Sequence, residues 1–175
     1  KIEKQVKTLK ENPAAGFVYC DNDFVDDQGR VTGDYVRKVK LVRGDALLDL
    51  FLDHFLMTPA VMLRRECLKK TGLFNEGLRV GEDYDFFLRL AEFYPLEVVE
   101  EKLWNRTVIR NSLSRQDYAA DARNDLNTLS GFLFRHPDFY RANKRPIVAR
   151  MAEYYFSFAY RLLEDGHNRV ALGHF

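Results

Sequence analysis

The sequence predicts an α/β protein whose last third is helical. From Lys1 to about Trp104, segments with helical periodicity alternate with short apolar runs typical of strands, and only helical patterns follow Ser114. The chain has 175 residues, of which 46% are apolar, enough for one sizeable core and too few for two comfortable domains. Its 14 Phe and 9 Tyr exclude a disordered chain, because such chains are poor in aromatic residues.

Each predicted element rests on a local signal. Apolar residues at helical spacing predict helices at residues 1–11, 46–56, 64–70, 82–94, 118–134, 147–164 and 169–175. Short apolar runs predict strands at residues 16–20, 59–63 and 96–104, and a ragged extended stretch at 31–42. Asn12-Pro13 stops the first helix, Asp45 is placed to cap the second, and Gly72 closes the third. Turn residues at 26–29 predict a hairpin tip.

The first helix carries its apolar residues on one face. Ile2, Val6 and Leu9 are spaced at i, i+4 and i+7, which is one stripe of an amphipathic helix. The chain opens on this helix without a preceding turn signal or initiator Met, and it closes inside an apolar pattern. We therefore expect both ends to be cuts through a larger protein.

Charge and cysteine content exclude several classes of protein. The 27 Lys and Arg nearly balance the 26 Asp and Glu, and a net charge of +1 lacks the basic footprint of a nucleic-acid binder or a polybasic membrane patch. Cys20 and Cys67 are too few for a disulfide framework or a metal quartet, and they fit a reducing compartment. Polar residues interrupt the most apolar window, 46–63, so no membrane span is predicted.

The acidic cluster Gly81-Glu82-Asp83-Tyr84-Asp85 is the most informative stretch for function. Its three carboxylates begin a predicted helix, where each would stabilise the helix dipole by ~0.3–1 kcal/mol and cap free N–H groups. A carboxylate at a loop-to-helix junction also suits a general base that takes a proton from a bound hydroxyl. The spacing alone favours helix stabilisation, so the surrounding residues must decide between the two interpretations.

A second acidic group, Asp21-Asn22-Asp23, follows the first predicted strand. Two carboxylates one residue apart could chelate a hard divalent cation, although such residues more often form solvated loops. The four histidines form no close ligand pair, and no serine or cysteine lies in a nucleophile-elbow pattern.

Together, these motifs resemble a known family. The matching segments occur in family order at residues 17–21, 26–29 (Asp-Asp-Gln-Gly), 58–66, 72–76, 81–90 and 112–114 (Ser-Leu-Ser). Over about residues 1–117 the chain resembles the second half of a family 2 glycosyltransferase with the GT-A fold, of bacterial type. The resemblance implies an incomplete GT-A domain (a nucleotide-diphospho-sugar transferase domain) that lacks its N-terminal nucleotide-binding half and is followed by α-helices.

The resemblance also implies a reaction. Such enzymes transfer a sugar from a nucleotide-diphosphate donor to the hydroxyl of a carbohydrate or lipid-linked acceptor, usually with inversion and with a divalent metal, Mn or Mg. The general base of the family maps onto Asp83, with Glu82 beside it, and Asp85 and Arg89 match positions with structural or acceptor-side roles. The segments expected to line the acceptor side are residues 58–63 and 74–76.

The chain also departs from the family pattern. The metal-binding Asp-x-Asp of the family precedes the helix that corresponds to residues 1–11, so we expect it, with the nucleotide-binding strands, outside this chain. Asp21 and Asp23 then match a later strand end, and the segment at Arg106 lacks the family's histidine. We therefore expect the chain alone to be inactive and unable to bind donor. Residues 118–175 are predicted to be a helical extension, either the start of a tetratricopeptide-like repeat or a plain helical hairpin.

Two other functions remain open. The aromatic helical tail could make the chain a non-catalytic protein-interaction module. A metal-dependent hydrolase using Asp21, Asp23 and Asp83 ranks last, because no phosphate-binding loop supports it.

For the glycosyltransferase we expect a cytoplasmic protein, free or peripheral at a membrane. An uncovered sheet edge would favour a homo-oligomer.

Overall fold

The computed structural model describes residues 1–32, 41–107 and 118–164. Helices accompany a three-stranded mixed sheet in these residues, as an α/β protein requires. The described chain forms two compact units, residues 1–74 with 85–107, and residues 75–84 with 118–164. Helix α4 (Glu82–Ala91) contributes to both, because its first turn belongs to the second unit and the rest to the first.

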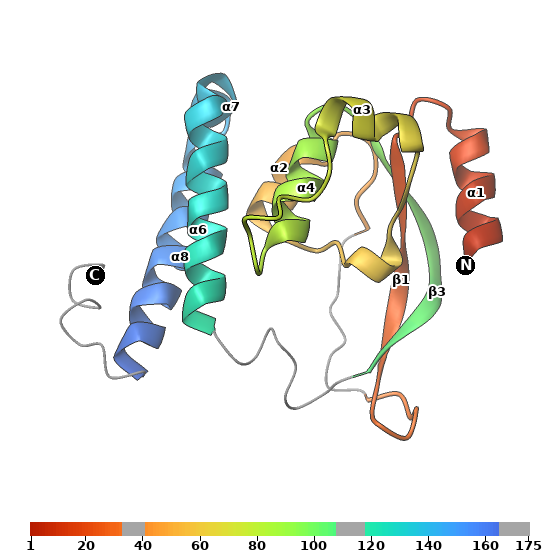
Figure 1. The fold of residues 1–175 in the computed structure, drawn as a ribbon, viewed down its shortest axis with the longest axis horizontal. Helices are drawn as coiled ribbons and strands as arrows, with labels where there is room; N and C mark the ends of the chain where they lie inside the picture. Colours follow the sequence, from red (N-terminus) through yellow and green to blue (C-terminus); the bar gives the residue numbers. More distant parts are fainter. Residues whose placement is uncertain (33–40, 108–117, 165–175) are drawn as a thin grey trace. The chain divides into compact units, whose positions relative to one another are not determined.

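The sheet of the first unit is built around its central strand β1 (Phe17–Val25). This strand pairs antiparallel with β2 (Met62–Leu63) and parallel with β3 (Leu96–Thr107), and Figure 1 shows β1 and β3 side by side. Their pairing continues from Phe17 to Val25 across register shifts on both sides of Asp21. The acidic triplet after the predicted strand is therefore itself strand, because β3 offers it a partner.

Short helices fill the rest of the first unit. They are α1 (Ile2–Glu11), α2 (Leu47–Leu52), the 3-10 turns η2 (Thr58–Ala60) and η3 (Arg65–Cys67), and α3 (Leu68–Thr71). The strand predicted at 59–63 is wrong for its first half, because Pro59 donates no N–H and its fixed φ suits the first turn of a helix. Asp45 Oδ1 accepts a hydrogen bond from Leu47 N at 3.2 Å, but Asp45 lies one residue before Ala46, the N-cap of α2. Gly72 ends α3 with φ +74°, as predicted.

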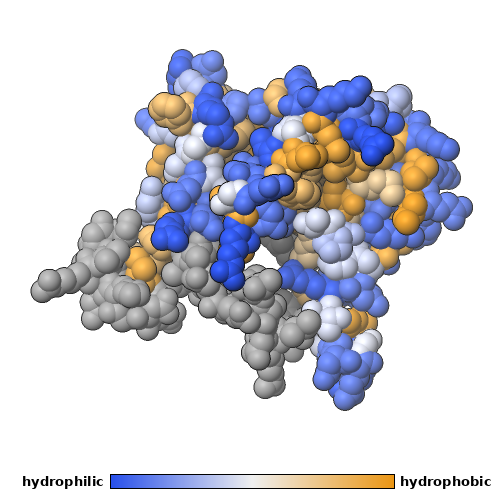
Figure 2. Space-filling model, viewed as in Figure 1, coloured by the Kyte–Doolittle hydropathy of each residue, from blue (hydrophilic) through white to orange (hydrophobic). Residues whose placement is uncertain are grey.

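Helix α1 buries a different face from the one its apolar stripe suggests. Gln5 and Leu9 are its buried residues, whereas Ile2 is 68% and Val6 36% exposed. The Gln5 Nε2 amide donates to the carbonyl oxygen of Ala60 at 2.7 Å, so this buried polar group is satisfied. Figure 2 shows apolar surface at the position of α1 and beside it.

The core of the first unit combines the strands with one face of α4. Its largest fully buried side chains are Phe17, Leu50, Phe51, Leu56, Phe86, Phe87, Leu88, Leu90 and Leu96. Gly16, just before β1, packs closely against Tyr94, which follows α4. A Cβ at position 16 would lie 2.5 Å from Tyr94 Cβ and 3.0 Å from Cys67 Sγ. A side chain at position 16 would therefore force this packing apart.

The described part of the second unit is helical apart from residues 75–81. It contains α6 (Tyr118–Arg135), α7 (Pro137–Ala142) and α8 (Lys144–Glu164), and Figure 1 shows α6 and α8 side by side with α7 at their junction. Its buried helical side chains are Leu126, Leu129, Phe132, Ile147, Phe158, Ala159 and Leu162. Helix α7 was not predicted, although Pro137 at its first turn is a favoured helix start. The helix predicted at 169–175 lies outside the described residues.

None of the described helices has an apolar stretch long enough to cross a bilayer.

Candidate functional site

The acidic cluster begins at a turn that only glycine fits. Gly81 has φ +79°, and a Cβ there would lie 3.3 Å from Asp125 Oδ1 and 3.8 Å from Asn124 Cβ on α6. Asn124 Nδ2 also donates to the Val80 carbonyl oxygen at 3.2 Å. The residues just before α4 thus lie directly against α6 in the second unit.

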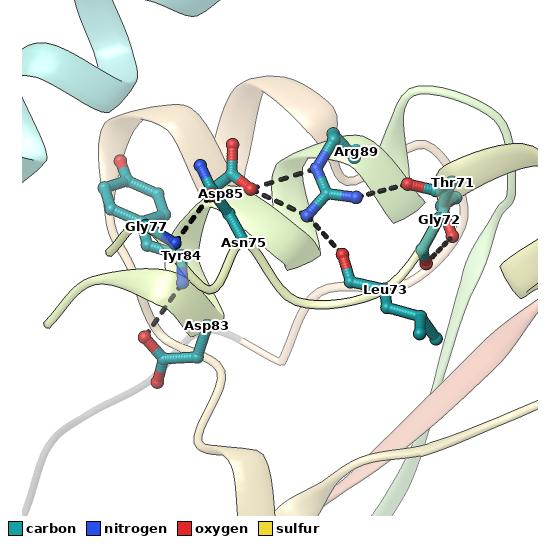
Figure 3. Close-up of polar contacts among 9 residues, drawn as sticks. All are labelled: Thr71, Gly72, Leu73, Asn75, Gly77, Asp83, Tyr84, Asp85 and Arg89. Carbon is teal, nitrogen blue, oxygen red and sulfur yellow. Dashed lines mark hydrogen bonds and ion pairs between the residues drawn. The ribbon is translucent and has the colours of Figure 1, made fainter. Parts of the chain in front are cut away.

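Glu82 and Asp83 form the first turn of α4 and are both partly buried. Asp83 Oδ1 accepts a hydrogen bond from Tyr84 N at 2.9 Å, as Figure 3 shows. Carboxylates at a helix N-terminus are favoured by the helix dipole. Asp83 therefore fits its helix-stabilising interpretation, and the residue as a whole remains partly exposed.

Tyr84 anchors the start of α4 in the second unit. Its side chain is fully buried, and its hydroxyl is hydrogen-bonded to that of Tyr154 on α8. Burial raises the pKa of Tyr84 well above its usual value, and the negative charge of Asp125 adds to this shift. The hydrogen bond to Tyr154 also raises the pKa of Tyr84, whereas it lowers the pKa of Tyr154.

Asp85 and Arg89 make a clamp in the first unit. Arg89 Nε and Nη2 donate to Asp85 Oδ2 at 3.0 and 2.7 Å. The same guanidinium donates to the carbonyl oxygens of Thr71 and Leu73, as Figure 3 shows. Arg89 therefore links α4 to the end of α3. Of the structural and acceptor-side roles expected for Asp85 and Arg89, these contacts favour the structural role.

Phe74, in the segment expected to line the acceptor side, packs its ring against that of Phe86 with centroids 4.4 Å apart. Its side chain is nevertheless 42% exposed. Phe74 thus exposes part of its ring to solvent, while the ring also packs on the buried Phe86.

The second acidic group is engaged within the sheet. Asp23 forms an ion pair with Lys102 on β3, which raises the pKa of that lysine, and Asp21 Oδ1 accepts from Asn22 N at 2.8 Å. Among the described residues, no three His, Cys, Asp or Glu side chains are grouped so that they could hold a metal ion. These contacts favour a structural interpretation of Asp21 and Asp23, and the described residues do not fit the implied Mn or Mg.

Sequence reasoning missed the groups that contact the acidic cluster from the tail. Asn124 and Asp125 lie on α6, and Arg150 and Tyr154 lie on α8. The i, i+4 spacing of Arg150 and Tyr154 was a usable signal, because residues four apart share a helix face. The guanidinium carbon lies 4.4 Å from the Tyr154 ring centroid. Nothing in the sequence pointed from Asn124 to Val80.

Compared with known proteins, the chain matches no family model, and no curated protein sequence matches it significantly.

Proposed function

We propose that the chain is the acceptor-side part of a family 2 glycosyltransferase with the GT-A fold, with Asp83 as its general base. The observation that carries the proposal is the ordered set of motifs leading to the Glu82-Asp83 pair at the start of a helix. The position of Asp83 supports it, because the residue is partly exposed in the first turn of α4, which neighbouring groups hold on both sides.

The proposed role of Asp83 is to remove the proton of the acceptor hydroxyl. As this oxygen forms its bond to the anomeric carbon of the donor sugar, the bond from that carbon to the nucleoside diphosphate breaks. A sugar hydroxyl is a weak nucleophile, so a positioned base contributes ~10²–10⁴-fold.

The test is Asp83→Asn in the full-length protein, incubated with a panel of UDP- and GDP-sugars and candidate acceptors. Release of nucleoside diphosphate should fall by about 10²-fold or more while donor binding is retained, because only the base is removed. Asp27→Asn, in the exposed hairpin turn, is the matched carboxylate control and should keep full turnover. Undiminished turnover in Asp83→Asn would overturn the assignment.

A second candidate function, a protein-interaction module, is favoured by the surface of α8. Phe156 is 59% and Val148 48% exposed, and their spacing of eight residues places them on one helix face. If this face binds a second copy of the chain, Phe156→Ser should lower the mass measured by light scattering. An unchanged mass would exclude self-association through this face.

A further inference from the structure

Two helices of the tail contact the chain on both sides of the candidate base. On the N-terminal side, Asn124 of α6 donates to Val80, and α6 packs so closely on Gly81 that a Cβ there would meet Asp125 Oδ1 at 3.3 Å. These contacts lie within one compact unit, although more than forty residues of sequence separate their partners. The turn that leads into Asp83 is therefore held by α6.

On the C-terminal side, the next residue is held by α8. Tyr84 is fully buried, and its hydroxyl is hydrogen-bonded to that of Tyr154. Arg150, one turn before Tyr154, orients the Tyr154 hydroxyl: its Nη2 donates to that oxygen at 3.4 Å, and its Nη1 donates to Glu153 at 3.0 Å. Tyr84, Tyr154 and Arg150 thus link the backbone beside Asp83 to the long helix.

We propose that α6 and α8 position Asp83 for catalysis, with Asn124 and Tyr154 as the positioning residues. The inference rests on the proposed function, because it concerns the base of that reaction. A base displaced by about 1 Å from its productive geometry loses on the order of 10² in rate, so a carboxylate in the first turn of a helix requires support of this kind. The helical tail is then part of the catalytic apparatus rather than an appended module.

The structural half of the proposal is tested by amide hydrogen exchange in the full-length protein. Tyr154→Phe removes only the hydroxyl that is hydrogen-bonded to Tyr84, and exchange over residues 80–84 should become about five- to tenfold faster while the buried turns of α6 and α8 keep their rates. Asn124→Ala should act likewise, and because alanine is the better helix former, a faster rate cannot come from a weakened α6. Tyr160→Phe and Asn127→Ala, exposed on the same helices, are the matched controls and should change nothing.

The catalytic half is tested by the kinetics of the same variants. Tyr154→Phe and Asn124→Ala should lower kcat by about tenfold or more and leave the KM for the donor unchanged, because only the base moves. Unchanged exchange in both variants would overturn the inference even if Asp83→Asn is inactive, and so would faster exchange with an undiminished kcat. Full turnover in Asp83→Asn would instead overturn the proposed function, and the inference with it.

Discussion

Several polar contacts of α4 converge on Arg89. Its guanidinium serves Asp85 and two carbonyl oxygens, and its carbon lies 5.5 Å from the ring centroid of Phe86. The Arg89 and Asp85 side chains are only 22% and 15% exposed, so water replaces little of what a substitution removes. This partial burial distinguishes the pair from an ordinary surface ion pair.

Arg89→Ala should therefore lower the free energy of unfolding by about 2–4 kcal/mol, because Asp85 and two carbonyl groups lose their donor. Arg89→Lys should recover part of the loss, since it keeps the charge but not the planar fork. Denaturant unfolding followed by circular dichroism measures both. Arg30→Ala is the matched control: Arg30 pairs with Asp26 at the same spacing but is 71% exposed, so its loss should cost less than about 1 kcal/mol. Equal losses at the two sites would contradict the role given to Arg89.

Helix α1 shows how an element can orient against its own apolar pattern. The stripe of Ile2, Val6 and Leu9 is intact in the sequence, yet of these only Leu9 is buried. Gln5 takes the place expected for an apolar residue because its amide reaches the Ala60 carbonyl oxygen in η2. A hydrogen bond at a buried carbonyl, which no apolar side chain can supply, thus fixes the orientation of the helix.

The two faces of α1 should respond in opposite ways to truncation. Gln5→Ala should lower the free energy of unfolding by about 1–3 kcal/mol, because the buried Ala60 carbonyl loses its amide donor. Val6→Ala should change it by less than about 0.5 kcal/mol, since the better helix propensity of alanine offsets the little area that Val6 buries. Thermal unfolding of the two variants compares them directly, and a greater loss in Val6→Ala would contradict the observed orientation.

Across the whole molecule, each unit contains a buried tyrosine. In the first unit, the Tyr19 hydroxyl oxygen accepts a hydrogen bond from Val42 N at 2.8 Å, and burial raises the pKa of Tyr19 to about 12. Tyr84 in the second unit is fully buried, and its pKa is also raised. Burial penalises the ionised phenolate in both, so both units depend on tyrosines that stay protonated.

The free energy of unfolding should consequently fall at alkaline pH. A pKa that is higher in the folded than in the unfolded state stabilises fully below the unfolded value, and this stabilisation is lost as the pH rises through the folded value. For Tyr19 the loss begins near pH 10 and amounts to about 1.4 kcal/mol per pH unit up to about pH 12. Urea unfolding at increasing pH measures the slope, which Tyr19→Phe should make shallower. The same slope in that variant would contradict the prediction.

Local signals were sufficient for many elements. The hairpin tip forms as predicted, because Asp26 Oδ1 accepts from Gln28 N and Arg30 N and Gly29 takes φ +79°. The helix at Glu82 and the helix end at Gly72 also follow from residues within a few positions of each. Acidic residues at a helix start and glycine at a helix end act through the nearest backbone groups, so these features need no distant partner.

The sequence by itself determined the α/β class, the hairpin turn at 26–29, the helix start at Glu82 and the presence of an acidic cluster there. Only the tertiary structure decided that β1 lies between β2 and β3, that it continues through Asp23 and that α1 buries Gln5. It also decided that residues 80–84 lie against α6 and α8, which gives Asp83 its surroundings. Strand pairing, helix orientation and side-chain contacts depend on groups far apart in the chain, and periodicity describes only neighbours.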